Sequence, residues 1–139
     1  MSDEIAFDLH GVLDTYPDLC MGLMKILRQL GYTIGCLSGP TKKQICNELD
    51  KLKEKGYDFE IEGKNIYSVV DSLKHWGVKF TYDDDGNPWC DEQVWWDSKA
   101  RICKAKFVDM LIDDSRKYES AFNLTEARYI HINEFVKEK

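Results

Sequence analysis

Residues 5–14 read I-A-F-D-L-H-G-V-L-D, and the prediction of the fold starts from this stretch. A short apolar run ends in Asp8, and Gly11 follows three residues later. This pattern is typical of a buried strand that brings a carboxylate to the edge of a parallel sheet, after which the chain turns away sharply. An aspartate in this place can also cap the following helix. A functional interpretation therefore needs polar residues at the ends of other strands.

Two further apolar runs end in polar side chains. The segment 34–40, I-G-C-L-S-G-P, contains Ser38, and M-L-I-D-D at 110–114 ends in Asp113 and Asp114. Ligands of open α/β sheets bind outside the carboxyl ends of the strands, so these groups are expected to share one crevice with Asp8. A carboxylate can attack phosphorus, and Mg²⁺ prefers oxygen ligands. A hydroxyl at Ser38 and N–H groups at the following helix start, beginning with Gly39, can hold phosphate oxygens. The pattern predicts a Mg²⁺-dependent phosphoryl-transfer site.

Strands and helices are expected to alternate along the chain. The predicted strands are 4–9, 33–37, 78–82, 107–112 and 128–132. The predicted helices are 17–30, 40–55, 65–76, a short helix capped by Ser98 that runs to Lys104, and 115–123. Alternation of this kind favours βαβ units. We expect a single Rossmann-like α/β domain over residues 1–139, with a parallel sheet of about five strands, helices on both faces and no large cap domain.

Composition narrows the class of protein. The chain has 139 residues and a formal net charge of -6, which disfavours nucleic acid as a bulk ligand. No apolar run approaches the ~20 residues that span a bilayer, and the start M-S-D-E lacks the features of a signal peptide, so a cytoplasmic protein with no membrane partner is expected. The five cysteines form no C-x-x-C pair, which favours small buried side chains over disulfides or zinc ligands. The oligomeric state is not predicted.

A cation is needed to balance the acidic residues. Lys99, Lys104 and Lys106 all lie shortly before the predicted strand 107–112, and Lys99 is the best placed to point into the crevice. The histidines at 75 and 131 have no partner pattern and are expected to be structural. Lys42 and Lys43 follow Ser38 closely and are either solvated or attract an anionic substrate.

Four short segments together resemble motifs one to four of the haloacid dehalogenase-like (HAD) hydrolase superfamily. They are D-x-x-G-V-L from Asp8, L-S-G around Ser38, S-K-A-R-I-C around Lys99 and M-L-I-D-D-S around Asp113, and they span about residues 5–115. The resemblance implies a parallel sheet, bound Mg²⁺ and an aspartyl-phosphate intermediate.

The same resemblance implies a role for each matched position. Asp8 would be the nucleophile and a metal ligand, and Ser38 would hold the phosphate. Lys99 would stabilise the charge of the nucleophile and of the phosphoryl group. Asp113 and Asp114 would serve the metal, and the backbone carbonyl of His10 would also bind it.

The chain departs from the family at position 10. Phosphatases of the family carry an aspartate there as general acid and base, whereas this chain has His10. Imidazole can transfer protons near neutral pH, but a bound cation close by disfavours its protonated form. Three interpretations stay open: a phosphatase that uses His10, a weak or differently specialised hydrolase, and a non-catalytic descendant. Asp14 either supplies a replacement carboxylate or orders the turn.

The expected function is the Mg²⁺-dependent hydrolysis of a phosphomonoester, such as a nucleotide or a sugar phosphate. The alternative is a metal- or phosphate-binding module without turnover. A small flap is expected over residues 83–96, and the tryptophans at 89, 95 and 96 either form a substrate platform or pack against the sheet. The sequence does not identify the substrate.

Overall fold

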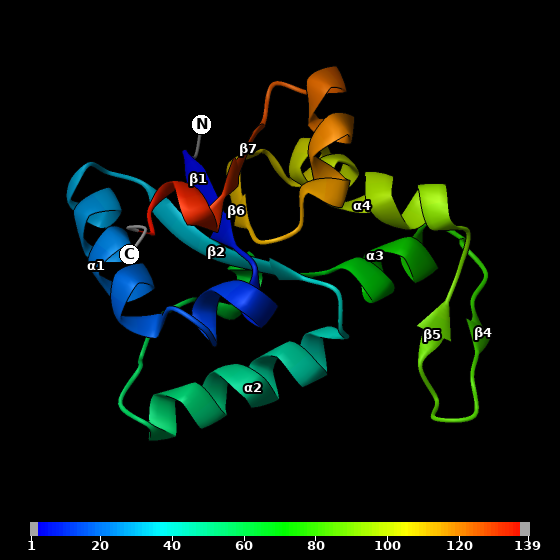
Figure 1. Cartoon of the computed structure of the whole chain (residues 1–139), viewed down its shortest axis with the longest axis horizontal. Helices are drawn as coiled ribbons and strands as arrows, with labels where there is room; N and C mark the ends of the chain where they lie inside the picture. The colour runs from blue at the N-terminus through cyan, green and yellow to red at the C-terminus, as the bar shows by residue number, and fades with distance from the viewer. Residues whose placement is uncertain (1–2, 137–139) are drawn as a thin grey trace.

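The computed structural model describes residues 3–136 as a parallel five-stranded sheet with helices on both faces (Figure 1). The strand order is β3-β2-β1-β6-β7, and each neighbouring pair is parallel. The strands are β1 (Glu4–Phe7), β2 (Thr33–Ser38), β3 (Ile66–Ser68), β6 (Val108–Asp113) and β7 (Arg128–His131). The predicted fold class, a Rossmann-like α/β domain with about five parallel strands, is confirmed.

The helices are α1 (Pro17–Gln29), α2 (Lys42–Glu54), α3 (Val69–His75) and α4 (Glu92–Lys106). Four further helical segments are not α-helical: the π-type turn η1 (Leu9–Leu13) and the 3-10 segments η2 (Gly63–Asn65), η3 (Arg116–Leu124) and η4 (Ile132–Glu134). Within residues 3–136, no helix is long and apolar enough to cross a membrane.

Side chains of the sheet alternate between two apolar layers, as the two-residue period of a strand requires. From β1, Ile5 and Phe7 pack in the layer that contains Cys20 of α1 and Ile45 of α2. Ala6 points to the other face, in the layer that contains residues of α3, α4 and η3. Both faces of the sheet are therefore buried, which explains why the central strands are almost continuously apolar.

The prediction of the third strand was wrong. The strand lies at Ile66–Ser68, inside the predicted helix 65–76, and α3 begins only after it. The hydroxyl of Ser68 accepts a hydrogen bond from the backbone N–H of Asp71 and so caps α3. Of the predicted strand 78–82, only Thr81–Tyr82 forms a strand, β4, which pairs antiparallel with β5 (Pro88–Trp89). The local D-D-D-G turn closes a hairpin, so this segment does not join the sheet.

The prediction that Ser98 caps a short helix was also wrong. Helix α4 starts seven residues earlier, where the carboxylate of Asp91 accepts from the N–H of Val94 at 3.0 Å. Ser98 is buried inside the helix, and its hydroxyl donates to the carbonyl of Trp95. The helix ends when Phe107 adopts a left-handed conformation with φ of 56°. The error arose because the aromatic residues before Ser98 gave no clear helical period.

Candidate active site

Parallel strands bring the predicted site residues to one edge of the sheet. Strand β1 lies between β2 and β6, and the chain leaves these three strands at Asp8, Ser38 and Asp113. Because all three strands run in the same direction, their carboxyl ends meet. Lys99 reaches this edge from α4, and Asp114 follows Asp113 directly.

Lys99 lies between two buried carboxylates. Its ammonium Nζ is 2.9 Å from Oδ2 of Asp113 and 3.3 Å from Oδ2 of Asp8, and only 2% of its side chain is exposed. The ring of Tyr118 lies beneath the ammonium, with 4.2 Å between Nζ and the ring centroid. Burial lowers the pKa of Lys99, but the negative charges of Asp8 and Asp113 outweigh it and raise the pKa overall, so the lysine is charged. Lys104 and Lys106, the other lysines considered, are exposed.

Asp8 and Asp113 respond differently to the shared lysine. Burial raises the pKa of Asp8 to about 8; Lys99 opposes this rise and the charge of Asp113 adds to it. Asp113 is also buried, but Lys99 and hydrogen bonds from Asp8 and from the N–H of Asp114 lower its pKa. Without a bound metal ion, Asp8 is therefore the member of the pair that keeps a proton to higher pH, and Asp113 is the member that stays charged beside Lys99.

Asp8, Asp113 and Asp114 form the set of groups suited to a metal ion. Each offers a carboxylate oxygen, and these oxygens all lie within 4.8 Å of one another. Asp114 is the exposed member, and burial together with the neighbouring Asp113 raises its pKa. Three carboxylates of which one faces solvent fit Mg²⁺, which prefers oxygen ligands and keeps part of its water shell.

Gly11 allows the turn η1 to lie against Asp114. Its φ is 85°, a conformation that L-residues avoid, and a Cβ at this position would stand 1.8 Å from Oδ2 of Asp114. The turn is fixed at its start by Asp8, whose Oδ1 accepts from the N–H of Leu9 at 2.8 Å. Glycine is therefore required at position 11 for two reasons: the positive φ, and the close approach of the backbone to the Asp114 side chain.

His10 lies on the surface of the same turn. Its side chain is 54% exposed, and Nδ1 is 3.3 Å from Oδ2 of Asp14. The other oxygen of Asp14 accepts from the N–H of Gly11 at 2.7 Å and from the hydroxyl of Thr15 at 2.9 Å. Asp14 thus orders the turn, as one of the two interpretations held. The imidazole is therefore exposed to solvent and in contact with Asp14.

Ser38 and Gly39 differ in what surrounds them. Ser38 is buried, and its hydroxyl interacts with Asp8 and lowers the pKa of that carboxyl. Gly39 packs closely against Trp95. A Cβ at position 39 would be 3.3 Å from Cζ2 of that ring. The carbonyl of Gly39 accepts from the N–H of Val70 at 3.1 Å, so this residue also anchors α3.

The predicted start of the second helix was two residues early. Helix α2 begins at Lys42, and Thr41 is its N-cap. The hydroxyl of Thr41 accepts from the N–H of Gln44, while the Gln44 side chain accepts from the N–H of Thr41. Gly39 therefore belongs to the loop that precedes the cap.

His131 was expected to be structural, and the structure shows that it supports the backbone of the site. His131 ends β7 directly beside Asp113 in the strand register. Its Nδ1 accepts from the N–H of Asn133 at 3.1 Å, so Nε2 carries the hydrogen and donates to the carbonyl of Asp114 at 2.8 Å. His131 therefore holds the backbone that presents Asp114. Its place at the end of a predicted strand was the signal that could have identified it.

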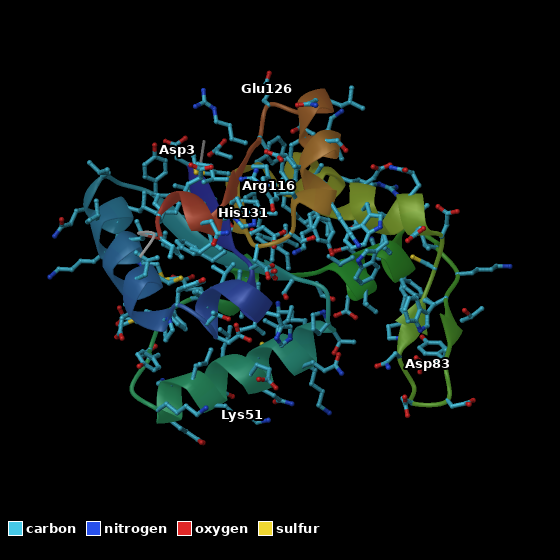
Figure 2. All side chains as sticks on the ribbon, viewed as in Figure 1. Asp3, Lys51, Asp83, Arg116, Glu126 and His131 are labelled. Atoms are coloured by element: carbon cyan, nitrogen blue, oxygen red, sulfur yellow. The ribbon has the colours of Figure 1, made fainter. Side chains whose placement is uncertain are left out.

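The segment 83–96 is partly a hairpin and partly helix. Strands β4 and β5 project from the body of the molecule, and Asp83 lies at their connecting turn (Figures 1 and 2). The Asp83 carboxylate accepts hydrogen bonds from Asp85, Asn87 and Trp89, which makes this a self-contained polar turn. Trp89 is 60% exposed, whereas the two tryptophans of α4 pack in the apolar layer.

No protein-family model matches the chain, and no curated protein matches it. A crystal structure of a glycosyltransferase from Rickettsia africae ESF-5 is similar in fold, with a TM-score of 0.49 and 19% sequence identity. The alignment covers 94% of this chain and 29% of that one, so the chain spans less than a third of the other protein.

Proposed function

We propose that the chain is a Mg²⁺-dependent phosphatase of the HAD-like type that acts through an aspartyl-phosphate on Asp8. The observation that supports this most is the burial of Asp8 beside the ammonium of Lys99, 3.3 Å away, with two further carboxylates within metal-binding reach. A nucleophilic carboxylate, a fixed positive charge and a metal site are the parts that phosphoryl transfer needs. The proposed substrate is a phosphomonoester, such as a nucleotide or a sugar phosphate.

The proposed reaction has two steps. An oxygen of Asp8 attacks phosphorus, the bond from phosphorus to the ester oxygen breaks, and the leaving oxygen takes a proton from an acid. Water then attacks the acyl-phosphate, releases phosphate and restores Asp8. In this proposal Lys99 balances negative charge on Asp8 and on the phosphoryl group throughout, and the hydroxyl of Ser38 would donate to a phosphate oxygen.

The metal is held in this proposal by Asp8, Asp114 and the backbone carbonyl of His10, with Asp113 in support. Bound Mg²⁺ would neutralise charge on the phosphoryl oxygens. In this proposal the proton donor for the leaving group is His10, whose exposed side chain lies on turn η1. The proton is taken back from the attacking water in the second step.

A second candidate is a metal- and phosphate-binding module without turnover. The observation that favours it is the exposed imidazole at position 10, in place of a carboxylate, beside a site built to attract a cation. Both candidates use the same carboxylates and differ only in whether a proton reaches the leaving group.

Hydrolysis of p-nitrophenyl phosphate and of a panel of phosphomonoesters, with and without Mg²⁺, tests the proposal. We expect turnover only with Mg²⁺, and Asp8→Asn should abolish it. Asp18→Asn, which changes an exposed carboxylate at the start of α1, is the control and should retain most of the activity. Absence of turnover over the whole panel, with Mg²⁺ binding intact by calorimetry, would favour the module.

His10→Asp separates the interpretations of position 10. If the imidazole is a poor acid, the introduced carboxylic acid should raise kcat on p-nitrophenyl phosphate about 10²-fold, which is the lower range for general acid catalysis. A loss of activity would show that the histidine itself is required.

A further inference from the structure

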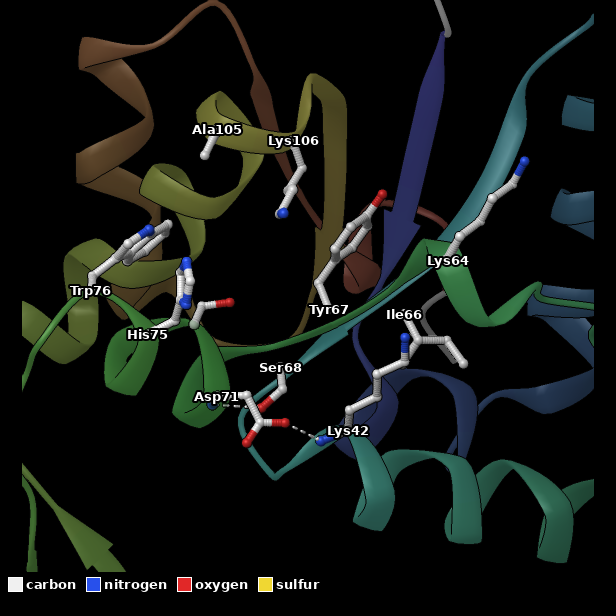
Figure 3. A pocket seen from close by; sticks show the side chains of 11 residues that line it. Lys42, Lys64, Ile66, Tyr67, Ser68, Asp71, His75, Trp76, Ala105 and Lys106 are labelled. Atoms are coloured by element: carbon white, nitrogen blue, oxygen red, sulfur yellow. Dashed lines mark hydrogen bonds between the residues drawn. The ribbon is translucent and has the colours of Figure 1, made fainter.

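A cavity separate from the carboxylate site lies beside the edge strand β3 (Figure 3). Its volume is about 520 Å³, within the range of sites for small molecules. Its walls come from the start of α2, from η2 and β3, from α3 and from the end of α4. None of the proposed catalytic or metal-binding residues lines it.

The lining of this cavity is basic although the chain as a whole is acidic. Lysines from three different elements line the cavity, Lys42, Lys64 and Lys106, and His75 adds an imidazole; the Lys64 side chain extends away from the other two lysines (Figure 3). Figure 3 shows the side chain of Lys106 directed into the cavity. The formal net charge of the chain is -6, so a gathering of three lysines around one hollow is a local reversal of the overall charge.

These lysines have few anionic partners of their own. Among residues 3–136, the ammonium groups of Lys42 and Lys106 form no ion pair. Lys64 pairs with Glu62 at 3.5 Å, but both side chains are mostly exposed, so the pair is weak. The single carboxylate in the lining, Asp71, already accepts from the backbone N–H of Lys42 at 2.8 Å (Figure 3).

Two aromatic side chains, Tyr67 and Trp76, also line the cavity. Tyr67 stands on β3, and its hydroxyl donates to the buried carboxylate of Glu4 at 2.9 Å, which fixes the ring. Trp76 follows α3, and the guanidinium of Arg101 lies 4.0 Å from the centroid of its ring. Rigid rings offer a planar ligand group a contact surface at little cost in conformational entropy.

We propose that this cavity binds a small phosphorylated ligand with a planar group, of the nucleoside monophosphate class, independently of Mg²⁺. Lys42 and Lys106 supply positive charge for the phosphate, and Tyr67 and Trp76 supply the apolar contact. Binding here does not depend on the proposed phosphatase activity, because it uses no residue of the carboxylate site.

Calorimetric titration of the full chain with AMP, inorganic phosphate and adenosine, in the presence of EDTA, tests this inference. We expect AMP to bind more tightly than either fragment, and the side-chain indole signal of Trp76 in a ¹⁵N–¹H spectrum to shift on binding. The double variant Lys42→Gln/Lys106→Gln should weaken AMP binding about tenfold, as expected for the loss of two exposed ion pairs. Because both lysines are exposed, the variant is expected to fold.

Two controls make the outcome decisive. Lys104→Gln removes an exposed lysine two residues from Lys106 that does not line the cavity, and it should bind AMP as the wild type does. Asp8→Asn should also leave metal-free AMP binding unchanged, whatever it does to turnover. Absence of AMP binding at millimolar concentration, equal binding by the double lysine variant, or equal affinity for AMP and inorganic phosphate would overturn the proposal.

Discussion

At the scale of single residues, the site depends on Gly11, a position where no larger residue fits. Gly11 combines a positive φ with close approach to the carboxylate of Asp114. Gly31 has a similar φ of 95°, but no atom lies within 4 Å of where its Cβ would be. The two glycines therefore separate the cost of backbone conformation from the cost of crowding the site.

Gly11→Ala should weaken Mg²⁺ binding at least tenfold and destabilise the fold more than Gly31→Ala does. Both substitutions carry the cost of a left-handed residue, about 1–2 kcal/mol, but only the first displaces Asp114. Calorimetry with Mg²⁺ and urea unfolding measure the two effects. Equal behaviour of the two variants in both measurements would contradict the role given to Gly11.

The pKa of Asp8 predicts how metal affinity depends on pH. Since burial raises the pKa of Asp8 to about 8, the free site holds a proton at neutral pH that coordination must release. The affinity for Mg²⁺ should therefore rise between pH 6 and pH 8, by up to about tenfold per pH unit, and level off above that pKa. Titrations in buffers of different ionisation enthalpy count the released proton. The prediction fails if the affinity is independent of pH.

At the scale of elements, the amino end of β1 contains a buried acid away from the site. Glu4 is 3% exposed, and its Oε1 accepts from Asn65 and from Tyr67, at 3.0 and 2.9 Å. Its Oε2 is buried without a hydrogen-bond partner. These contacts join β1 to the edge strand β3 across β2, and burial of the charged carboxylate carries a cost in stability.

Glu4→Gln should raise the free energy of unfolding at pH 7 by about 1 kcal/mol, because it removes a negative charge that burial disfavours. Burial raises the pKa of Glu4 above 4.5 in the folded state. The native state is therefore penalised above that raised pKa, and the penalty disappears as pH falls through it towards 4.5. Urea unfolding at pH 7 and pH 4.5 should show the gain at the higher pH only. A variant less stable than the wild type at pH 7 would contradict the account.

Some elements were predictable and others were not, for reasons visible in particular residues. The strands that end at Ser38 and Asp113 are long apolar runs, and their positions were predicted to within one residue. Strand β3 has only three residues and merges directly into α3, so a helical period covered it. The segment 78–82 has strand-forming side chains, but a strand joins a sheet only where an open edge is within reach.

At the scale of the whole molecule, Lys99 links α4 to the ends of two strands. Lys99→Met should lower the free energy of unfolding by about 3–5 kcal/mol, because it leaves Asp8 and Asp113 buried together without a cation. Lys104→Met, on the exposed face of the same helix, should change stability by no more than about 0.5 kcal/mol. Urea unfolding at pH 7 measures both, and a Lys99 variant as stable as the Lys104 variant would contradict this role.

The sequence by itself determined the parallel α/β class, because hydrophobic period and strand-end polar residues are local properties of the chain. It also singled out Asp8, Ser38, Asp113 and Asp114, since the direction of parallel strands alone brings such ends together. Only the tertiary structure decided which lysine meets the carboxylates, that His131 holds Asp114, and that three distant lysines surround a second cavity. Those facts depend on how helices and edge strands pack across the sheet, and contacts between segments far apart in the chain leave no local period in the sequence.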